Sequence, residues 1–420
     1  MSNNKFQPPI TGETVKFNDK MRLRTTEPFW LLKNGLLHSY PSLQEDLSAE
    51  IVVIGGGITG ALISHALLEQ GYEVVLLDKR DTGQGSTAAT TAMLQYEIDV
   101  PLYQLADQIG EKAAADCYRA GIDAIETLAQ LIQNEQIDCG FQKKRSLYYA
   151  HNKKAAGWLL KEYELRNRYQ LGVQWLSADE LYNRYELKTC GGILSEKGAS
   201  MDAYRFAQLL IYKNSQRGLR VFDHTPLEKT DYSDSGVTIQ LTDGYKVQCK
   251  KIVYCSGFET VHLFPEKTAT LFSTFACVSE CGIRIPETLS DLLIWNTEDP
   301  YLYLRTTDDG RLLVGGEDSS YNSGVLRERL KKKKSERLIK KIQAVLPGVD
   351  FIEDFSWAGV FGATKDGLPY IGTHTQYPGA YFVLGFGGNG ITFSVQGMQL
   401  IQKLLKNEQD DLLYYYRFGR

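Results

Sequence analysis

The sequence predicts an α/β fold of two domains: a Rossmann-like domain on a parallel sheet and a second α+β domain on an antiparallel sheet. Three observations lead to this prediction. A strand, a glycine turn, a helix and a strand follow one another at residues 51–77, strands joined by aspartate–glycine turns follow residue 235, and an apolar strand returns at 381–384. The 420 residues are enough for two or three domains. With 43% hydrophobic and 23% charged residues, the composition is typical of globular proteins and excludes a disordered chain.

The first strand is a β-branched run at 51–54 that ends at glycine, and a helix at 58–70 and a strand at 73–77 complete a βαβ unit. Apolar residues at helical spacing across 103–135 predict two amphipathic helices, broken near Gly110 and Gly121. Further strands are expected at 145–150, 236–241, 246–255, 301–305 and 311–315, and further helices near 152–168, 178–184 and 203–216. Because the turns at 242–244 and 308–310 contain aspartate–glycine, the later strands should form antiparallel hairpins.

The domain boundaries follow from this order of elements. Residues 1–48 are polar and irregular and predict an ordered arm on the surface of a domain. The strand at 381–384 should complete the first domain, which then consists of residues 49–138, 199–260 and 351–420. Residues 139–198 and 261–350 should form the second domain.

The charge balance and the cysteines argue against several classes of protein. Lysine and arginine total 47 against 51 acidic residues, a net charge of −4, which predicts no binding to nucleic acid or to an anionic membrane surface. The seven cysteines and six histidines show no metal-ligand spacing, so we expect no metal site and a reducing compartment. The apolar stretch at 51–68 contains glycines that favour a buried strand and helix over a membrane span. The first residues lack an apolar signal segment, and we expect a cytoplasmic location.

The segment 327–341 is strongly basic, with Glu328 and Glu336 as its acidic residues. It is either a patch for an acidic partner or the solvated face of a surface helix. Leucine and isoleucine recur on one side at helical spacing from 326 to 346, which favours the surface helix.

A dinucleotide signature follows the first strand. Gly55-x-Gly57-x-x-Gly60 gives a tight turn, a close approach of backbone to a pyrophosphate, and close packing of helix and strand. Asp78 ends the next strand, where a carboxylate accepts hydrogen bonds from a ribose diol. The alternative, a turn needed only for packing, does not explain this combination of glycines and acid.

Two further segments indicate which dinucleotide is bound. Residues 83–92 are rich in small and hydroxyl side chains, as expected where backbone runs beside an extended ligand. Residues 385–392 form a second glycine-rich turn that opens a helix running to about residue 405. The N–H groups and the positive end of such a helix suit the negative charge of a reduced flavin ring, so the sequence predicts FAD.

At these motifs the chain resembles the FAD-dependent oxidoreductases of the D-amino acid oxidase superfamily, which includes glycine oxidase, sarcosine oxidase and γ-glutamylputrescine oxidase. The resemblance spans residues 48–405 and includes, in the family's order, VVIGGGITGALISHALLEQGYEVVLLDKR, the GxGST stretch, KGASMDAYRFAQLL, KIVYCSGFE, GRLLVGGE, WAGVFGATKDGLPYIG and GFGGNGIT. The TAATTAML and DGLPYIG segments are most similar to the subgroup that carries a Rieske iron–sulfur domain. Paired Cys-x-His and Cys-x-x-His ligands are absent from the sequence, so that cluster is not expected here.

The resemblance implies a Rossmann-like FAD-binding domain with an extended, non-covalent FAD. The implied pyrophosphate residues are Gly55, Gly57, Ile58, Thr59 and Gly60, and the implied adenosine residues are Asp78, Lys79, Arg80, Leu227, Ser256 and Gly257. The residues implied to lead toward the ring are Gly85, Ser86, Thr87, Thr90, Thr91, Ala92 and Met93, and those implied to cap it are Gly388, Asn389, Gly390, Ile391 and Thr392. The cysteine or histidine through which some relatives attach flavin is absent at the matching positions, which predicts dissociable FAD.

The chain departs from the family where the substrate is held. In glycine oxidase and D-amino acid oxidase an arginine grips the substrate carboxylate, and Phe361 stands at that position here. Arg305 is a second candidate for this role, with an ordinary ion pair as the alternative. The aromatic candidates for the substrate pocket are Tyr96, Tyr301, Tyr303 and Phe361, each of which ordinary sheet packing would also explain.

The resemblance implies oxidation of a C–N bond of a small amine or amino acid by hydride transfer to flavin N5, hydrolysis of the imine, and reoxidation of the flavin by oxygen, giving hydrogen peroxide, or by another acceptor. Two alternatives stay open. One is a flavin dehydrogenase of the same fold that passes electrons to a quinone or protein. The other is a nicotinamide-dependent or nucleotide-sensing protein without flavin chemistry.

Overall fold

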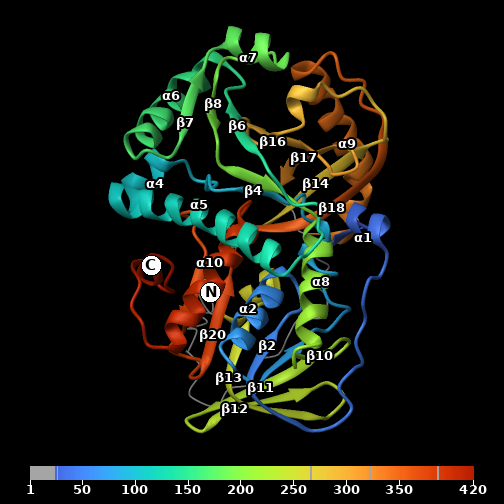
Figure 1. The fold of residues 1–420 in the computed structure, drawn as a ribbon, viewed down its shortest axis with the longest axis vertical. Helices are drawn as coiled ribbons and strands as arrows, with labels where there is room; N and C mark the ends of the chain where they lie inside the picture. The colour runs from blue at the N-terminus through green and yellow to red at the C-terminus, as the bar shows by residue number, and fades with distance from the viewer. Residues whose placement is uncertain (1–23, 26, 265–266, 321–322, 386) are drawn as a thin grey trace, which may run out of the picture.

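Two large sheets, one built on parallel strands and the other mainly antiparallel, form the two halves of the molecule (Figure 1). The structure is a computed structural model that describes residues 24–25, 27–264, 267–320, 323–385 and 387–420. The predicted α/β fold, with a parallel and an antiparallel sheet, is confirmed.

The eight-stranded sheet is built around β2 (Leu47–Ile54), which pairs in parallel with β3 (Val74–Leu77) on one side and β13 (Lys246–Tyr254) on the other. The second half of β2 and all of β3 are buried, as expected for parallel strands covered on both faces. The remaining strands of this sheet are β10 (Arg220–Phe222), β11 (Leu227–Ser233), β12 (Gly236–Leu241), β19 (Tyr370–Thr373) and β20 (Ala380–Leu384). The return of β20 to pair with β13 agrees with the predicted completion of this sheet by the C-terminal segment.

Helices α2 (Ile58–Glu69), α8 (Ala203–Ser215) and α10 (Gly390–Leu405) pack together beside this sheet (Figure 1). Residues of α2 are buried on nearly every side, because the sheet and both neighbouring helices cover it. The apolar stretch at 51–68 is therefore a core strand and helix. No helix within the described ranges is both long enough and apolar enough to cross a membrane.

The nine-stranded sheet has the strand order β1, β18, β14, β17, β16, β15, β6, β8, β7. Its strands are β1 (Arg24–Thr25), β6 (Arg145–Tyr149), β7 (Val173–Leu176), β8 (Gly192–Ser195), β14 (Thr270–Ser279), β15 (Leu292–Asn296), β16 (Leu302–Thr306), β17 (Leu312–Ser319) and β18 (Glu353–Ala363). Helices α6 (Lys153–Arg168), α7 (Ala178–Tyr185) and α9 (Gly324–Val345) lie in this half of the molecule (Figure 1).

The position of β18 corrects the predicted domain boundary at residue 351. This strand pairs along its length with β14 and so belongs to the antiparallel sheet, although we had placed 351–420 with the parallel sheet. The chain crosses back toward the parallel sheet only after Ala363. The other predicted boundaries stay predictions.

A second correction concerns Gly121. The break predicted at Gly110 exists, between α4 (Leu102–Ile109) and α5 (Glu111–Asn134), but α5 runs straight through Gly121. A Cβ at Gly121 would lie 3.0 Å from Cα of Tyr96, so glycine here allows α5 to pack against the neighbouring backbone. This glycine serves close packing and does not end the helix.

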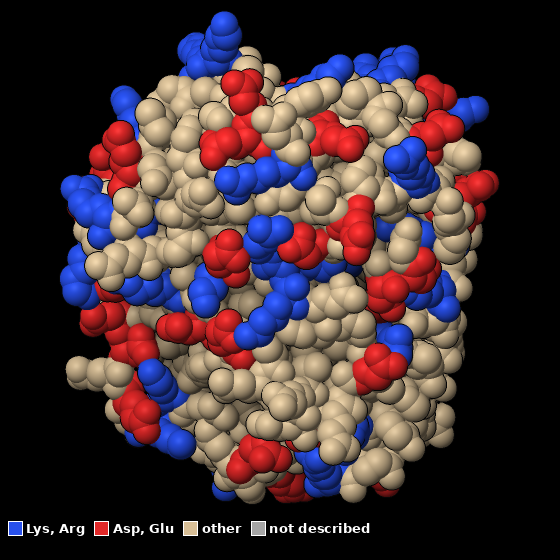
Figure 2. Space-filling view, turned by 45° about the horizontal axis from the view of Figure 1, so that its top comes forward, with Lys and Arg blue, Asp and Glu red and all other residues tan. Residues whose placement is uncertain are grey.

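The basic segment 327–341 lies within α9, and the surface-helix interpretation is only partly correct. Arg327 is 1% and Lys334 8% exposed, so part of the segment is buried. Glu317 of β17 forms ion pairs with Lys334, Arg337 and Lys341, with N–O distances of 3.0–3.4 Å. On the face drawn in Figure 2, basic and acidic side chains are interspersed.

The remaining elements are small. The strands β4 (Met93–Gln95), β9 (Gly198–Ser200) and β5 (Gln142–Lys143) form a third sheet, in the order β4, β9, β5. Short helices are α1 (Phe29–Asn34), α3 (Ser86–Ala89), α11 (Asp411–Tyr415) and the 3-10 turns Gly257–Leu263 and Glu287–Leu289. The described part of the predicted N-terminal arm includes α1, and residues 1–23 and 26 lie outside the described residues.

Candidate active site

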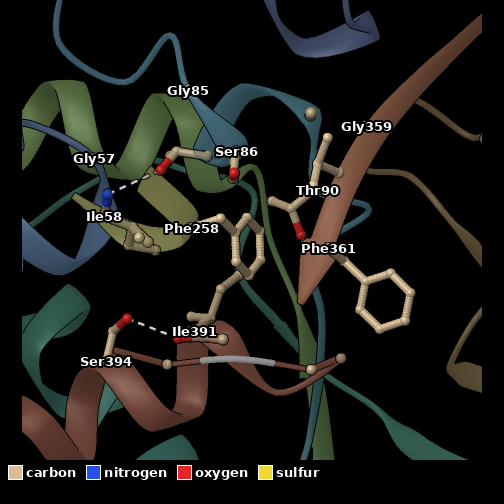
Figure 3. Close-up of a pocket in the computed structure, with 18 of the residues that line it drawn as sticks. Gly57, Ile58, Gly85, Ser86, Thr90, Phe258, Gly359, Phe361, Ile391 and Ser394 are labelled. Atoms are coloured by element: carbon tan, nitrogen blue, oxygen red, sulfur yellow. Dashed lines mark hydrogen bonds between the residues drawn. The ribbon is translucent and has the colours of Figure 1, made fainter. Parts of the chain in front are cut away.

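A cavity of about 390 Å³ brings the two glycine-rich helix starts together. Gly57 at the start of α2 and Gly388 beside the start of α10 both line it, although more than 300 residues separate them in the sequence. In Figure 3 the Phe258 ring lies between Ile58 and Thr90, and the Phe361 ring lies on the other side of Thr90.

The turn between β2 and α2 explains the first glycine motif. Gly55 adopts φ +104°, and a Cβ there would lie 2.7 Å from the carbonyl oxygen of Cys255. A Cβ at Gly60 would lie only 1.9 Å from the carbonyl oxygen of Gly55. Gly57 has no side chain to cap α2, so the positive end of the helix faces the cavity, as in anion-binding helix starts.

Asp78 lines the cavity and also holds the glycine turn. Its Oδ2 accepts the Gly56 N–H at 2.7 Å, and its Oδ1 accepts the Arg80 N–H at 2.9 Å. Burial raises the pKa of Asp78, while Arg80 and the two backbone N–H donors counteract this rise. Because each carboxylate oxygen has accepted one hydrogen bond, each retains a lone pair for a further donor.

Lys79 and Arg80 line the same end of the cavity and share one carboxylate partner. Lys79 Nζ lies 3.2 Å and Arg80 Nη1 3.1 Å from Oε1 of Glu259, whose side chain is 9% exposed. Sequence analysis missed the role of Glu259, although it lies in the KIVYCSGFE motif. This one carboxylate offsets part of the positive charge that the two cations present to a ligand.

The segment after α3 is held by three side chains from distant parts of the sequence. Thr87 Oγ1 accepts the Ile58 N–H at 2.9 Å and so ties α3 to α2 (Figure 3). The carbonyl groups of the last residue of α3 and of the two residues after it each accept one side-chain N–H. These bonds are Trp357 Nε1 to Ala89 O at 2.8 Å, Trp30 Nε1 to Thr90 O at 2.7 Å, and Arg305 Nε to Thr91 O at 2.7 Å.

Arg305 is therefore an anchor of this segment, and its candidacy as a substrate-carboxylate clamp was wrong. The side chain is 2% exposed, lies over the Trp30 ring, and does not line the cavity. Its guanidinium also donates to the carbonyl oxygens of Thr306 and Met201. Burial lowers the pKa of Arg305 to about 10, so the group stays charged at neutral pH.

Residues 93–99 alternate between the cavity and the core. Met93, Gln95, Glu97 and Asp99 line the cavity. Leu94, Tyr96 and Ile98 point to the opposite side and belong to the main apolar core. Polar residues at every second position after Met93 are the sequence signal that predicts Gln95, Glu97 and Asp99 on one side of the segment.

Tyr96 was therefore wrong as a pocket candidate. It is 1% exposed and packs edge-on against Tyr118 at 5.9 Å between ring centroids. The alternation that brings its neighbours Gln95 and Glu97 to the cavity turns Tyr96 away from it.

The start of α10 is fastened to this same segment. Asn389 Nδ2 donates to the carbonyl oxygens of Gln95 and Glu97, at 3.0 and 2.8 Å. The Gly388 N–H donates to Oδ2 of Asp99 at 2.9 Å. The second glycine motif and residues 95–99 thus form one wall of the cavity.

An aromatic wall comes from β16 and from glycines of β17. Tyr301 and Tyr303 line the cavity, while Leu302 and Leu304 between and beyond them lie in the core of the antiparallel sheet. A Cβ at Gly315 would lie 2.2 Å from the Tyr303 hydroxyl oxygen. Glycine in the GRLLVGGE motif therefore makes room for the Tyr303 ring.

Replacing Gly315 with alanine should displace the Tyr303 ring, because a Cβ and that hydroxyl cannot occupy the same space. We expect FAD retention to stay within about twofold, since Tyr303 lies outside the glycine turns, while KM rises about tenfold. Flavin absorbance per polypeptide and steady-state kinetics measure the two quantities. Equal losses in both would contradict this assignment, and Gly157→Ala on the exposed face of α6 is the control.

Comparison with known proteins decides the family. A family profile described as FAD dependent oxidoreductase matches residues 50–402, most of the chain. The chain belongs to this FAD-dependent oxidoreductase family. FAD is the cofactor of the enzyme, and this removes the alternative of a nicotinamide-dependent or nucleotide-sensing protein.

Individual relatives of this FAD-dependent oxidoreductase agree with the family. The putative Rieske 2Fe-2S iron-sulfur protein YhfW of Bacillus subtilis is 23% identical over 401 residues, which cover 94% of this chain and 75% of that protein. The glycine oxidase of Geobacillus kaustophilus is 24% identical over 370 residues, 86% of this chain and 93% of that protein. The crystal structure of glycine oxidase from Geobacillus kaustophilus superposes with a TM-score of 0.70 and 20% identity, covering 87% of this chain and 96% of that structure.

Most residues that the sequence assigned to FAD line the cavity of the oxidoreductase. Those residues are Gly55, Gly57, Ile58, Thr59, Asp78, Lys79, Arg80, Gly85, Ser86, Thr87, Thr90, Thr91, Met93, Leu227, Ser256, Gly257, Gly388, Asn389, Gly390 and Ile391. Three do not line it: Gly60 packs against Gly55, Ala92 is in the core with φ +51°, and the Thr392 hydroxyl donates to Asn389 O.

Phe361 lines the cavity of the oxidoreductase at the position where the family resemblance places an arginine. It projects from β18, and its ring lies 5.5 Å from the Phe272 ring on the paired strand. A guanidinium is therefore missing at this point of the wall. Sequence analysis did not find the stacked pair Tyr148 and Trp295, which also line the cavity, since each comes from a strand with no motif.

Proposed function

We propose that this oxidoreductase binds FAD along the cavity and oxidises the C–N bond of a small amine or amino acid beside Tyr301, Tyr303 and Phe361. The observation that supports the proposal is that the starts of α2 and α10 open on one cavity that also contains an aromatic wall. A single extended dinucleotide explains both glycine-rich turns.

The α2 end of the cavity suits the adenosine diphosphate half of FAD. The uncapped helix start offers N–H groups to the pyrophosphate, and Thr87 fixes the turn that carries them. Asp78 retains lone pairs for the ribose hydroxyls, and Leu227 lies where the adenine would pack. Absence of a side chain at Gly57 lets the backbone approach the ligand, because a Cβ there would lie 2.9 Å from Thr87 Oγ1.

The α10 end suits the flavin ring. FAD, when bound, supplies the two-electron acceptor for the hydride that leaves the substrate carbon. The N–H groups at the start of α10 offer hydrogen bonds and a positive dipole end to the ring. Burial raises the pKa of Tyr301 and Tyr303, so both phenols stay protonated and act as hydrogen-bond donors toward the substrate.

The substrate carbon loses a hydride and its nitrogen a proton, and water then hydrolyses the imine product. We infer that FAD is dissociable, since the thiol among the described lining residues is Cys255, which lies against Gly55 at the α2 turn, the end of the cavity that suits the adenosine half. Oxygen, giving hydrogen peroxide, or another acceptor takes the electrons. The seven free cysteines agree with a proposed cytoplasmic location.

The test uses the purified protein loaded with FAD. Small amines and amino acids are screened for anaerobic loss of the flavin absorbance at about 450 nm, which reports reduction of the flavin. Assays with oxygen and with artificial acceptors then separate an oxidase from a dehydrogenase. A flavin-loaded protein that no amine or amino acid reduces would contradict the proposed reaction.

A further inference from the structure

The substrate end of the cavity has an acidic and aromatic lining. We propose that it selects an amine that carries a second ammonium group and no carboxylate, the chemistry of a diamine or polyamine. This inference rests on the proposed function and names its substrate class.

The charged residues of the lining divide between the two ends of the cavity. Among the described lining residues the cations are Lys79 and Arg80, and both lie at the adenosine end, where they pair with Glu259. The substrate end has the carboxylates of Glu97 and Asp99, together with Glu298, which is paired with Lys341 at 2.9 Å. A ligand carboxylate would meet negative charge there without a cationic partner.

Glu97 has an unused oxygen in a buried place. The residue is 4% exposed and lines the cavity, and its Oε2 has no hydrogen-bond partner among the described groups. Its Oε1 lies 3.5 Å from Arg166 Nη1, but Arg166 is also bound by Glu162 at 2.7 Å. Burial raises the pKa of Glu97 and Arg166 counteracts this rise, and because Arg166 is shared with Glu162, Glu97 keeps an oxygen that can accept from a cation.

Asp99 is the second free acceptor. Within the described part of the chain its carboxylate accepts the Gly388 N–H and forms no ion pair. Its side chain lines the cavity and is exposed there. A bound ammonium group would favour the ionised form.

Aromatic faces complete the site. Tyr148 and Trp295 line the cavity as a stacked pair with ring centroids 3.6 Å apart. Tyr301 and Tyr303 add two more rings, 5.6 Å apart. Aromatic faces beside carboxylates bind alkylammonium groups through cation–π attraction and ion pairing.

The need for a second ammonium group follows from the chemistry. The nitrogen attached to the carbon that loses the hydride must be neutral, because its lone pair forms the new C=N bond as the hydride leaves. Carboxylates that held this nitrogen as a cation would slow the reaction. The negative charge of these carboxylates helps when it binds a different ammonium group of the same molecule. Phe361 provides no cation that could bind a substrate carboxylate.

The experiment compares three amines with four carbon atoms each on the FAD-loaded enzyme: putrescine, butylamine and γ-aminobutyrate. They share one aminopropyl chain and differ in the far group, which is aminomethyl (charged as ammonium), methyl or carboxylate. Binding is measured from the perturbation of the flavin spectrum, and turnover from its anaerobic bleaching. We expect putrescine to bind about tenfold more tightly than butylamine and about 100-fold more tightly than γ-aminobutyrate.

Asp99→Asn tests the assignment within the protein. Asparagine still accepts the Gly388 N–H, so the start of α10 keeps its contact, while the negative charge is lost. Putrescine affinity should fall about tenfold and butylamine affinity about twofold. Asp107→Asn, an exposed change on α4 with the same loss of charge, is the matched control and should alter neither affinity.

Two failures are distinguishable. If γ-aminobutyrate or glycine binds and reduces the flavin better than putrescine, the substrate class is wrong while the proposed oxidation stands. If putrescine perturbs the spectrum with the expected preference but no amine bleaches the flavin, the proposed function is wrong and the binding site stands. Equal binding of putrescine by wild-type enzyme and Asp99→Asn overturns the assignment of Asp99.

Discussion

Replacing Gly60 with alanine is expected to abolish FAD retention and to lower the free energy of unfolding by about 3 kcal/mol or more. A Cβ at this position would lie 1.9 Å from the carbonyl oxygen of Gly55, and both atoms belong to backbone that cannot move independently. Relief of the clash requires α2 to separate from the β2 turn, which moves Gly57 and Ile58 at the cavity. Flavin absorbance per polypeptide and urea unfolding give the two readouts.

Gly157→Ala is the matched control for this change. Gly157 lies in the exposed face of α6, has no left-handed φ, and has nothing within 4 Å of an added Cβ. Alanine is the better helix former, so the control should gain about 0.5–1 kcal/mol and retain FAD normally. Normal FAD content in Gly60→Ala would show that the turn tolerates a side chain and would contradict the packing argument.

The second large effect is expected for Arg166→Met. Arg166 is fully buried, pairs with Glu97 and Glu162, and lies within 5.5–5.9 Å of the ring centroids of Tyr96, Tyr118 and Tyr148. Its loss leaves two buried carboxylates without a cation, which costs about 3–5 kcal/mol. Urea unfolding at neutral pH measures the change in the free energy of unfolding.

Arg168→Met on the same helix provides the control. Its side chain is 61% exposed and pairs with Glu111 at 3.1 Å, so its loss should change stability by less than about 0.5 kcal/mol. A similar small effect for Arg166→Met would show that Glu97 and Glu162 accept protons at little cost. That result would also weaken the argument that Glu97 is available to a cation.

The sequence was sufficient for the parts of the molecule in which backbone geometry depends on residue type. The β-branched run at 51–54, the three glycines after it and the glycines at 385–390 specified a strand, a turn and two helix starts, and the structure places these on one cavity. The break at Gly110 followed from the same reasoning. Gly121 did not break its helix, because glycine serves close packing as well as chain termination and spacing alone does not separate the two.

The substrate end depended on tertiary pairing, which a single sequence does not contain. Arg305 follows Tyr301 and Tyr303 at the two-residue spacing of side chains on one face of a strand. It nevertheless does not line the cavity, because its Nε donates to the carbonyl oxygen of Thr91. The stack of Tyr148 on Trp295 exists because β6 pairs with β15 across a large gap in sequence. At this end the sequence contains one usable signal, the alternation of polar and apolar residues after Met93. It predicts that Glu97 faces the cavity and that Tyr96 faces the core.

The tie between α1 and the segment after α3 has a consequence for handling the enzyme. Trp30 donates to Thr90 O, and Thr90 lines the cavity, so α1 supports this part of the cavity wall. Proteolytic cleavage between α1 and β2 that detaches α1 should release FAD before the rest of the protein unfolds, and saturating FAD should in turn protect this stretch from cleavage.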